Sequence, residues 1–137
     1  MTANPVQPPA AGDNERRTAF RALLDEFALG WNGGEPERMA GVFRPDGTFK
    51  PGPFEAACKG HDAILDYWRD VPEAQEEVSF RYGEVFAVGP WFATEFRCTY
   101  TRRRTGDRVD VRGALFCETG GDKISEMRMY WERRVRE

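Results

Sequence analysis

The first half of the chain carries its large apolar residues at helical spacing. Between Phe20 and Trp31 they recur every three or four positions, which places them on one stripe of an amphipathic helix. Asn32-Gly33-Gly34 is a typical helix end, because glycine tolerates the left-handed conformation that follows a last turn. Two further helices are expected, one with Pro36 in its first turn and one over about residues 61–70.

The second half alternates apolar and polar residues, which is the pattern of half-buried strands. Strands are expected over residues 78–82, 96–100 and 123–134, besides a short one at 48–50. Thr105-Gly106-Asp107 and Thr119-Gly120-Gly121-Asp122 are hairpin turn sequences between strands. In the last strand the pattern places three large apolar side chains on the inner face: Met127, Met129 and Trp131.

Three helices followed by a strand meander predict an α+β fold with the helices packed on one face of a bent sheet. At 137 residues the chain suits a single domain. We place that domain at residues 15–135. Residues 1–14 contain three prolines and almost no large apolar side chains, so we expect them to form a flexible tail.

Composition narrows the classes of function. The formal net charge is −3, with 20 basic and 23 acidic residues mixed along the chain, which argues against a nucleic-acid partner. Apolar runs are too short for a membrane span. Three cysteines (Cys58, Cys98 and Cys117) lack the spacing of a zinc site, and the single histidine excludes a multi-histidine metal site. We therefore expect a soluble, cytoplasmic protein without a bound metal.

Several motifs then resemble the nuclear-transport-factor-2-like superfamily, most of all its SnoaL-like group. Residues 27–34 and 43–49 resemble the opening of proteins in this superfamily. The match continues through Gly60-His61-Asp62-Ala63-Ile64 and Tyr67-Trp68. Residues 122–126 leading into Tyr130-Trp131-Glu132 resemble the last hairpin of the family. The resemblance covers residues 15–134. It implies a cone-shaped domain, in which a strongly curved, mostly antiparallel sheet and the helices enclose a pocket.

The resemblance also implies expectations about partners and chemistry. Cofactors are generally absent from the superfamily, and many members are dimers, so we expect no cofactor and a homodimer through the outer face of the sheet. The catalytic groups of its ketosteroid isomerases fall on Phe27, Pro51 and near Ala114 here. None of these side chains supplies the base or the oxyanion donors of that reaction. Ketosteroid isomerase chemistry by that route is therefore not expected.

Four other residues are candidates for proton transfer or oxygen binding: His61, Tyr100, Asp110 and Arg112. His61 is either an exposed residue at a helix start or an acid–base group in the pocket. The strand register decides whether Asp110 and Arg112 face the pocket or the solvent. A two-residue turn would pair Phe96 with Leu115 and place both outside, whereas a bulged turn would turn them inward.

Large apolar residues supply the walls of the predicted pocket, although core packing is the alternative reading of each: Phe27, Trp31, Phe49, Trp68, Phe96, Phe116, Met127, Met129 and Trp131. The sequence thus predicts cofactor-free binding of a small apolar or aromatic molecule. Lyase, isomerase or cyclase chemistry would extend this function. The alternative is a non-catalytic, dimeric ligand-binding or interaction module.

Overall fold

The computed structural model describes residues 11–136. Its long first helix, α1 (Ala11–Gly33), is followed by α2 (Pro36–Ala40), α3 (His61–Arg69) and a single turn, α4 (Val71–Ala74). The strands follow the predicted meander: β1 (Phe43–Lys50), β2 (Cys58–Lys59), β3 (Gln75–Tyr82), β4 (Phe86–Val88), β5 (Trp91–Arg102), β6 (Arg108–Gly120) and β7 (Lys123–Arg136).

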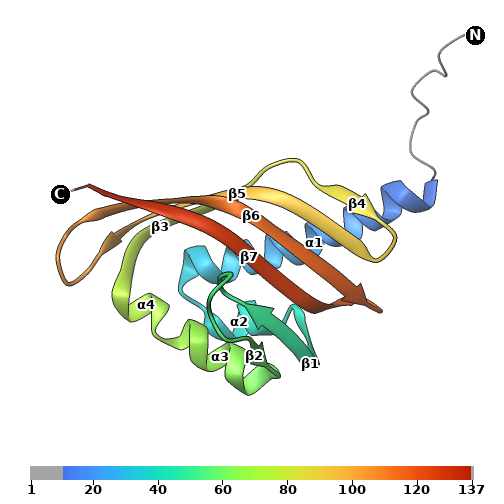
Figure 1. Cartoon of the computed structure of the whole chain (residues 1–137), viewed down its shortest axis with the longest axis horizontal. Helices are drawn as coiled ribbons and strands as arrows, with labels where there is room; N and C mark the ends of the chain where they lie inside the picture. The colour runs from blue at the N-terminus through green and yellow to red at the C-terminus, as the bar shows by residue number, and fades with distance from the viewer. Residues whose placement is uncertain (1–10, 137) are drawn as a thin grey trace, which may run out of the picture.

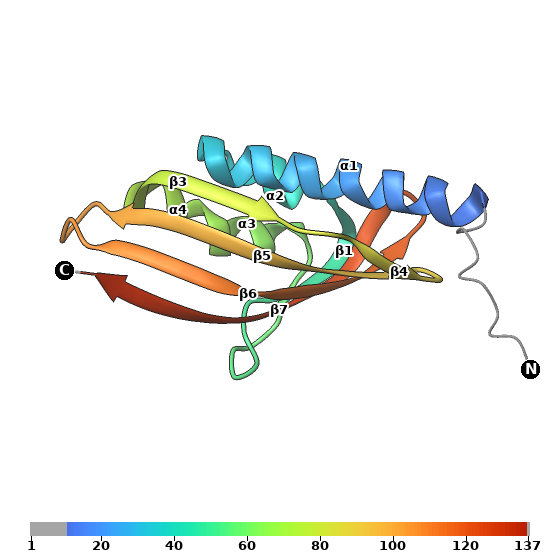
Figure 2. The same ribbon diagram turned by 90° about the horizontal axis from the view of Figure 1, so that it is seen from above.

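The strands form one curved sheet in the order β2-β1-β7-β6-β5-β3, with β4 paired to β5. All pairs are antiparallel except β1 with β7. Figure 1 shows the long strands β5, β6 and β7 crossing the molecule, with α3 and α4 below them. In Figure 2, α1 runs along one side of the curled sheet. The predicted α+β cone with a mostly antiparallel sheet is therefore confirmed.

The core lies between the inner face of this sheet and the helices. It contains fully buried side chains from α1, β1, α3 and β7, such as Phe27, Phe49, Ile64 and Met127. Phe27 packs edge-on against Trp31 and Trp68, with ring centroids 6.1 and 5.5 Å away. The helical stripe and the strand alternation thus meet in one aromatic core, which fixes the end of α1 against α3.

Several elements differ from the prediction: β2, β4 and α4 were not expected, and β3 and β5 begin before residues 78 and 96. The strand expected at residues 48–50 begins already at Phe43, because a bulge between Phe43 and Thr48 lets Pro45-Asp46-Gly47 remain within β1. The tail predicted for residues 1–14 falls mostly outside the described residues, and α1 already includes residues 11–14. None of the described helices is long and apolar enough to cross a membrane.

The register of β5 and β6 decides which side chains face the core. Phe96 pairs with Gly113, two residues away from the Leu115 partner of the two-residue turn. A shift of two residues leaves every side chain on the same face. A four-residue turn causes the shift, with the Arg102 amide donating to the Asp107 carbonyl at 2.9 Å. Asp110 and Arg112 consequently lie on the outer face.

Candidate functional site

A pocket of about 240 Å³ lies between α3, α4 and the inner face of the sheet. Its walls come from every layer of the fold: Trp31, Glu55, Tyr67, Trp68, Val71, Gln75, Phe96, Tyr100, Val111, Met129, Trp131 and Arg133. The end of α1, the loop between β1 and β2, and four strands therefore meet at this point. The pocket is rich in aromatic rings and also holds one carboxylate and one guanidinium group.

Hydrogen bonds hold two of the tryptophans in place. The indole N–H of Trp31 donates to Oε1 of Gln75 at 3.0 Å, and that of Trp131 donates to the Pro51 carbonyl at 2.6 Å. Since the Gln75 oxygen is the acceptor, its amide nitrogen keeps both hydrogens for other partners. The indole N–H of Trp68 is buried and has no partner among the described residues.

Two tyrosine hydroxyls in the pocket remain available as donors. Neither Tyr67 nor Tyr100 forms a side-chain hydrogen bond with another of residues 14–136. Burial, and to a smaller extent the nearby Glu55, Cys58 and Tyr100, raise the pKa of Tyr67 to about 12. Tyr67 therefore stays protonated at physiological pH and can donate a hydrogen bond.

Glu55 and Arg133 add opposite charges to the same pocket. Within the described part of the chain, neither side chain lies within ion-pairing distance of an opposite charge. Glu55 belongs to the loop between β1 and β2, which projects from the body in Figure 2. Arg133 follows Trp131 by two residues on β7. An unpaired carboxylate beside neutral phenols can accept a proton from a bound molecule.

The other hollows lie at the start of α1 or on the outer face of the sheet, and one of about 390 Å³ is lined only by charged residues: Asp110, Arg112, Glu132, Arg133, Arg134 and Arg136. One of about 370 Å³ lies at the start of α1, against Gly89, Pro90 and Asp122. Another of about 410 Å³ lies on the outer face, over Trp91, Phe116, Arg128 and Tyr130. No group of three or more His, Cys, Asp or Glu side chains in the described region could hold a metal ion. The pocket around Trp31 and Tyr100 is therefore the candidate site.

The sequence profile of the SnoaL-like domain matches residues 21–127 of this chain. The chain belongs to the SnoaL-like family. The match spans α1 to the middle of β7 and so includes most of the pocket walls. A comparison with curated proteins gave no match.

Solved structures with the same fold include proteins of different roles. SalBIII, an epoxide hydrolase/cyclase-like enzyme of pyran ring formation in salinomycin, is 21% identical with a TM-score of 0.75, over 90% of this chain and 98% of that one. A protein from Catenulispora acidiphila with a ketosteroid isomerase-like fold, in complex with trimethylamine, is 19% identical with a TM-score of 0.72, over 79% and 83%. A computationally designed 17-OHP binder is 15% identical with a TM-score of 0.73, over 85% and 96%. These similarities establish the fold of the SnoaL-like domain and leave its ligand open.

Of the four predicted chemical residues, only Tyr100 lines the pocket of this SnoaL-like domain. Nε2 of His61 lies 2.9 Å from the Phe43 carbonyl, where it links the first turn of α3 to the start of β1. A carbonyl can only accept, so Nε2 carries the proton. His61 is not among the residues that line the pocket, which agrees with the helix-start reading.

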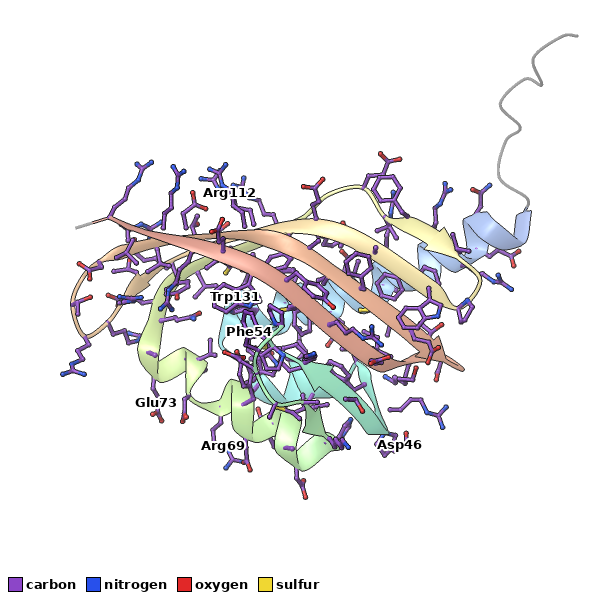
Figure 3. All side chains as sticks on the ribbon, in the orientation of Figure 1. Asp46, Phe54, Arg69, Glu73, Arg112 and Trp131 are labelled. Atoms are coloured by element: carbon purple, nitrogen blue, oxygen red, sulfur yellow. The ribbon has the colours of Figure 1, made fainter. Side chains whose placement is uncertain are left out.

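Of the two orientations left open for Asp110 and Arg112, the structure has the outward one, because the register of β5 and β6 turns both residues away from the core. Arg97 and Arg112 each donate two hydrogen bonds to the Asp110 carboxylate, at 3.1 to 3.4 Å. These bonds lower the pKa of Asp110 to about 2. Figure 3 shows Arg112 on the side of the sheet opposite to the helices.

The residues predicted as apolar walls divide between the pocket, the core and the outer face. Trp31, Trp68, Phe96, Met129 and Trp131 line the pocket, whereas three fully buried side chains lie in the core: Phe27, Phe49 and Met127. Phe116 does not belong to the interior, because it lies on the outer face of β6 and is 44% exposed. The positions of the ketosteroid isomerase catalytic groups are also unsuited to that reaction in the structure. Phe27 is fully buried in the core, and Ala114 faces outward beside Tyr130.

Sequence reasoning missed Glu55, Tyr67, Gln75 and Arg133, which supply most of the polar chemistry of the pocket. Tyr67 precedes Trp68 on α3 and lies on the same side of the helix, with ring centroids 5.2 Å apart. A search for polar residues next to predicted apolar walls would have found it. Glu55 lies in a loop, where no periodicity indicates direction.

Proposed function

We propose that this SnoaL-like domain binds a small molecule of one or two rings in the pocket around Trp31 and Tyr100. The observation that carries the proposal is the combination of aromatic walls with two unpartnered phenols in one pocket. Its volume of about 240 Å³ exceeds the ~150 Å³ cavity that accepts benzene and falls below the ~300 Å³ of the smallest drug-sized sites.

Intrinsic fluorescence tests this proposal directly, because Trp31, Trp68 and Trp131 line the pocket while Trp91 lies on the outer face. Titration with indole and 2-naphthol should change the emission saturably. Val71→Phe should fill the pocket and weaken binding about tenfold or more. Val88→Phe is the matched control, since Val88 is 81% exposed on β4. Equal affinities in both variants would place any binding elsewhere.

We further propose that the pocket supports proton transfer of the isomerase, lyase or cyclase type. Glu55 is the base, and Tyr67 and Tyr100 donate hydrogen bonds to an oxygen that gains negative charge. The raised pKa keeps Tyr67 protonated at physiological pH, so that its hydroxyl can donate a hydrogen bond to the oxyanion. The cyclase-like SalBIII has the same fold, which shows that the fold is compatible with such chemistry.

Exchange of protons next to the carbonyl of 2-tetralone in D2O, followed by NMR, is a suitable assay. Glu55→Gln should lower the exchange rate about a hundredfold, which is the usual scale of a general base. Glu84→Gln, on an exposed loop residue, should leave the rate unchanged. If the wild type exchanges no faster than buffer, the pocket binds without this chemistry.

The second candidate is a non-catalytic, dimeric ligand-binding module, and the outer face of the sheet favours the dimer. Arginines gather over one half of that face: Arg81, Arg97, Arg108, Arg112, Arg134 and Arg136. Asp110 and Glu132 lie among these arginines. The other half carries mostly acidic and aromatic side chains, with Arg128 among them: Trp91, Glu95, Phe116, Glu118, Glu126 and Tyr130. Two copies related by a two-fold axis would bring unlike halves together.

We also propose a cytoplasmic location. Cys58, Cys98 and Cys117 are free thiols in the structure, and a reducing compartment keeps thiols in that state. Detection of all three as free thiols in protein isolated under alkylating conditions would support this location, and a native disulfide would contradict it.

A further inference from the structure

Arg133 gives the pocket a positive charge that the proposed proton transfer does not use. It lies on the inner face of β7, directly across from Val111, which is another pocket residue. Among residues 14–136 no carboxylate lies within ion-pairing distance of its guanidinium. Arg133 is exposed, and it lines both this pocket and the charged hollow that contains Asp110 and Glu132. A guanidinium without an ion-pair partner at the wall of a pocket favours an anionic group on whatever enters.

Gln75 offers a second donor to the same kind of group. Its Oε1 accepts from Trp31, so its amide N–H bonds remain free at the pocket wall. A guanidinium and a primary amide are the donors that a carboxylate accepts well.

The negative charge of the pocket lies in a different place. Glu55 comes from the loop between β1 and β2 and raises the pKa of Tyr67. Arg133 comes from β7, where it lies opposite Val111. A ligand that satisfies both charges must carry an anion on one side and a proton-bearing group on the other.

Resting on the small-molecule binding proposed above, we propose that the natural ligand is an aromatic carboxylate. Its carboxylate binds Arg133 and the Gln75 amide, its ring lies among Trp31, Tyr100 and Trp131, and a hydroxyl or acidic C–H group faces Glu55 and Tyr67. The aromatic walls hold the ring, and the two unpaired charges fix its direction.

The test uses two probes of the same shape, 4-hydroxyphenylacetate and the neutral 4-hydroxyphenylacetamide. Binding is measured by tryptophan fluorescence and confirmed by calorimetry. The wild type should bind the acid about tenfold or more tightly than the amide, the usual scale for one charge-assisted contact. Arg133→Gln should abolish that preference with little change in amide binding.

Arg134→Gln is the matched control, because the neighbouring Arg134 faces the opposite side of the sheet, where it lies across from Asp110 in the register of β6 and β7. It should keep the full preference for the acid. Equal affinity of the wild type for both probes, or an unchanged preference in Arg133→Gln, would overturn the inference and leave the proposed function intact. If neither these probes nor indole and 2-naphthol bind, the proposed function itself is wrong. Circular dichroism of each variant shows that it is folded.

Discussion

Gly113 determines how closely β6 and β7 approach each other beside the pocket. It pairs with Phe96 on one side and with Trp131 on the other, and both of these side chains line the pocket. A Cβ atom at Gly113 would lie 2.7 Å from Cα of Trp131 and would also clash with the Tyr130 carbonyl. The missing side chain therefore allows the two aromatic neighbours to lie over the sheet at this point.

Gly113→Ala should destabilise the domain, because the clash is with backbone atoms that cannot rotate away. A loss of about 1–3 kcal/mol in the free energy of unfolding is the usual cost of overpacking. Urea denaturation measures it. Gly83→Ala is the control, since a Cβ atom there meets only the Glu95 carbonyl at an ordinary 3.7 Å. A Gly113→Ala protein as stable as the control would show that the strands separate easily.

His61 should affect stability and leave binding unchanged. Its Nε2 lies 2.9 Å from the Phe43 carbonyl, away from the pocket walls. His61→Ala should lower the free energy of unfolding by about 1 kcal/mol through the lost hydrogen bond. His61→Gln should bind 2-naphthol with the wild-type affinity and pH profile, as measured by fluorescence. A changed pH profile in His61→Gln would show that His61 takes part in ligand binding.

At the residue scale, alternation along one strand could be predicted, and pairing between strands could not. The inward face of Met127, Met129 and Trp131 is confirmed, because seven or more residues of one strand share a single period of two. Phe116 was placed on the wrong face, since its direction depends on the length of a distant turn. The hydrophobic pattern alone does not decide which face Phe116 occupies, because both faces of β6 carry apolar residues.

The loop between β1 and β2 is the element on which Glu55 depends. It is attached to the sheet at Pro51, whose carbonyl accepts from the Trp131 indole, and again at Cys58, which pairs with Phe49. Between these points Phe54 is fully exposed, and Figure 3 labels it on this loop. The position of Glu55 therefore depends on the Trp131 hydrogen bond together with the Cys58 pairing and the bond from the Glu55 amide to the Gly52 carbonyl at 3.2 Å.

Trp131→Phe should keep an aromatic side chain but remove the indole hydrogen bond, and so loosen the loop. The backbone amides of Gly52 and of residues 54–57 should exchange hydrogen faster, and 2-naphthol should bind several-fold more weakly because Glu55 and the wall are less well ordered. Trp91→Phe on the outer face is the control and should change neither measurement. Equal exchange rates in both variants would mean that the loop is held without the Trp131 bond, by the Cys58 pairing and the turn from Gly52 to Glu55.

Among the elements, the long helices were the most predictable. The stripe from Phe20 to Trp31 and the helix at residues 61–70 recur as α1 and α3, because each buries one continuous apolar face. The turn α4 was missed, since a helix was expected to break before Pro72, and proline is also compatible with a first turn. Val71 and Gln75 reach the pocket only because this extra turn is present.

For the molecule as a whole, low pH should remove one electrostatic contribution to the free energy of unfolding, that of Asp110 on the outer face. The pKa of Asp110 is about 2 in the folded protein and near 3.9 in an unfolded chain. A depressed pKa stabilises the fold above the unfolded value, and this gain is lost as the pH falls from about 4 to 2. The effect should be below about 1 kcal/mol, because the ion pairs lie at the surface.

Asp110→Asn measures this contribution. Urea midpoints at pH 6 and pH 3 should differ less in the variant than in the wild type. Asp122→Asn, an exposed turn residue, should keep the wild-type difference. If Asp110→Asn shows the full wild-type loss at pH 3, other carboxylates are responsible for the acid sensitivity.

The distribution of charge over the outer face gives the last prediction, which concerns the dimer. Arg108 and Glu118 lie near opposite ends of the outer face of β6. A two-fold axis through the middle of that strand would place Arg108 of one copy over Glu118 of the other, twice in the dimer. Arg108→Glu or Glu118→Arg alone should then give monomers in light scattering, through like-charge repulsion. An equimolar mixture of the two variants should dimerise again, because each unlike pair is restored. High salt should weaken the restored dimer, and a mixture that stays monomeric would contradict this arrangement of the two copies.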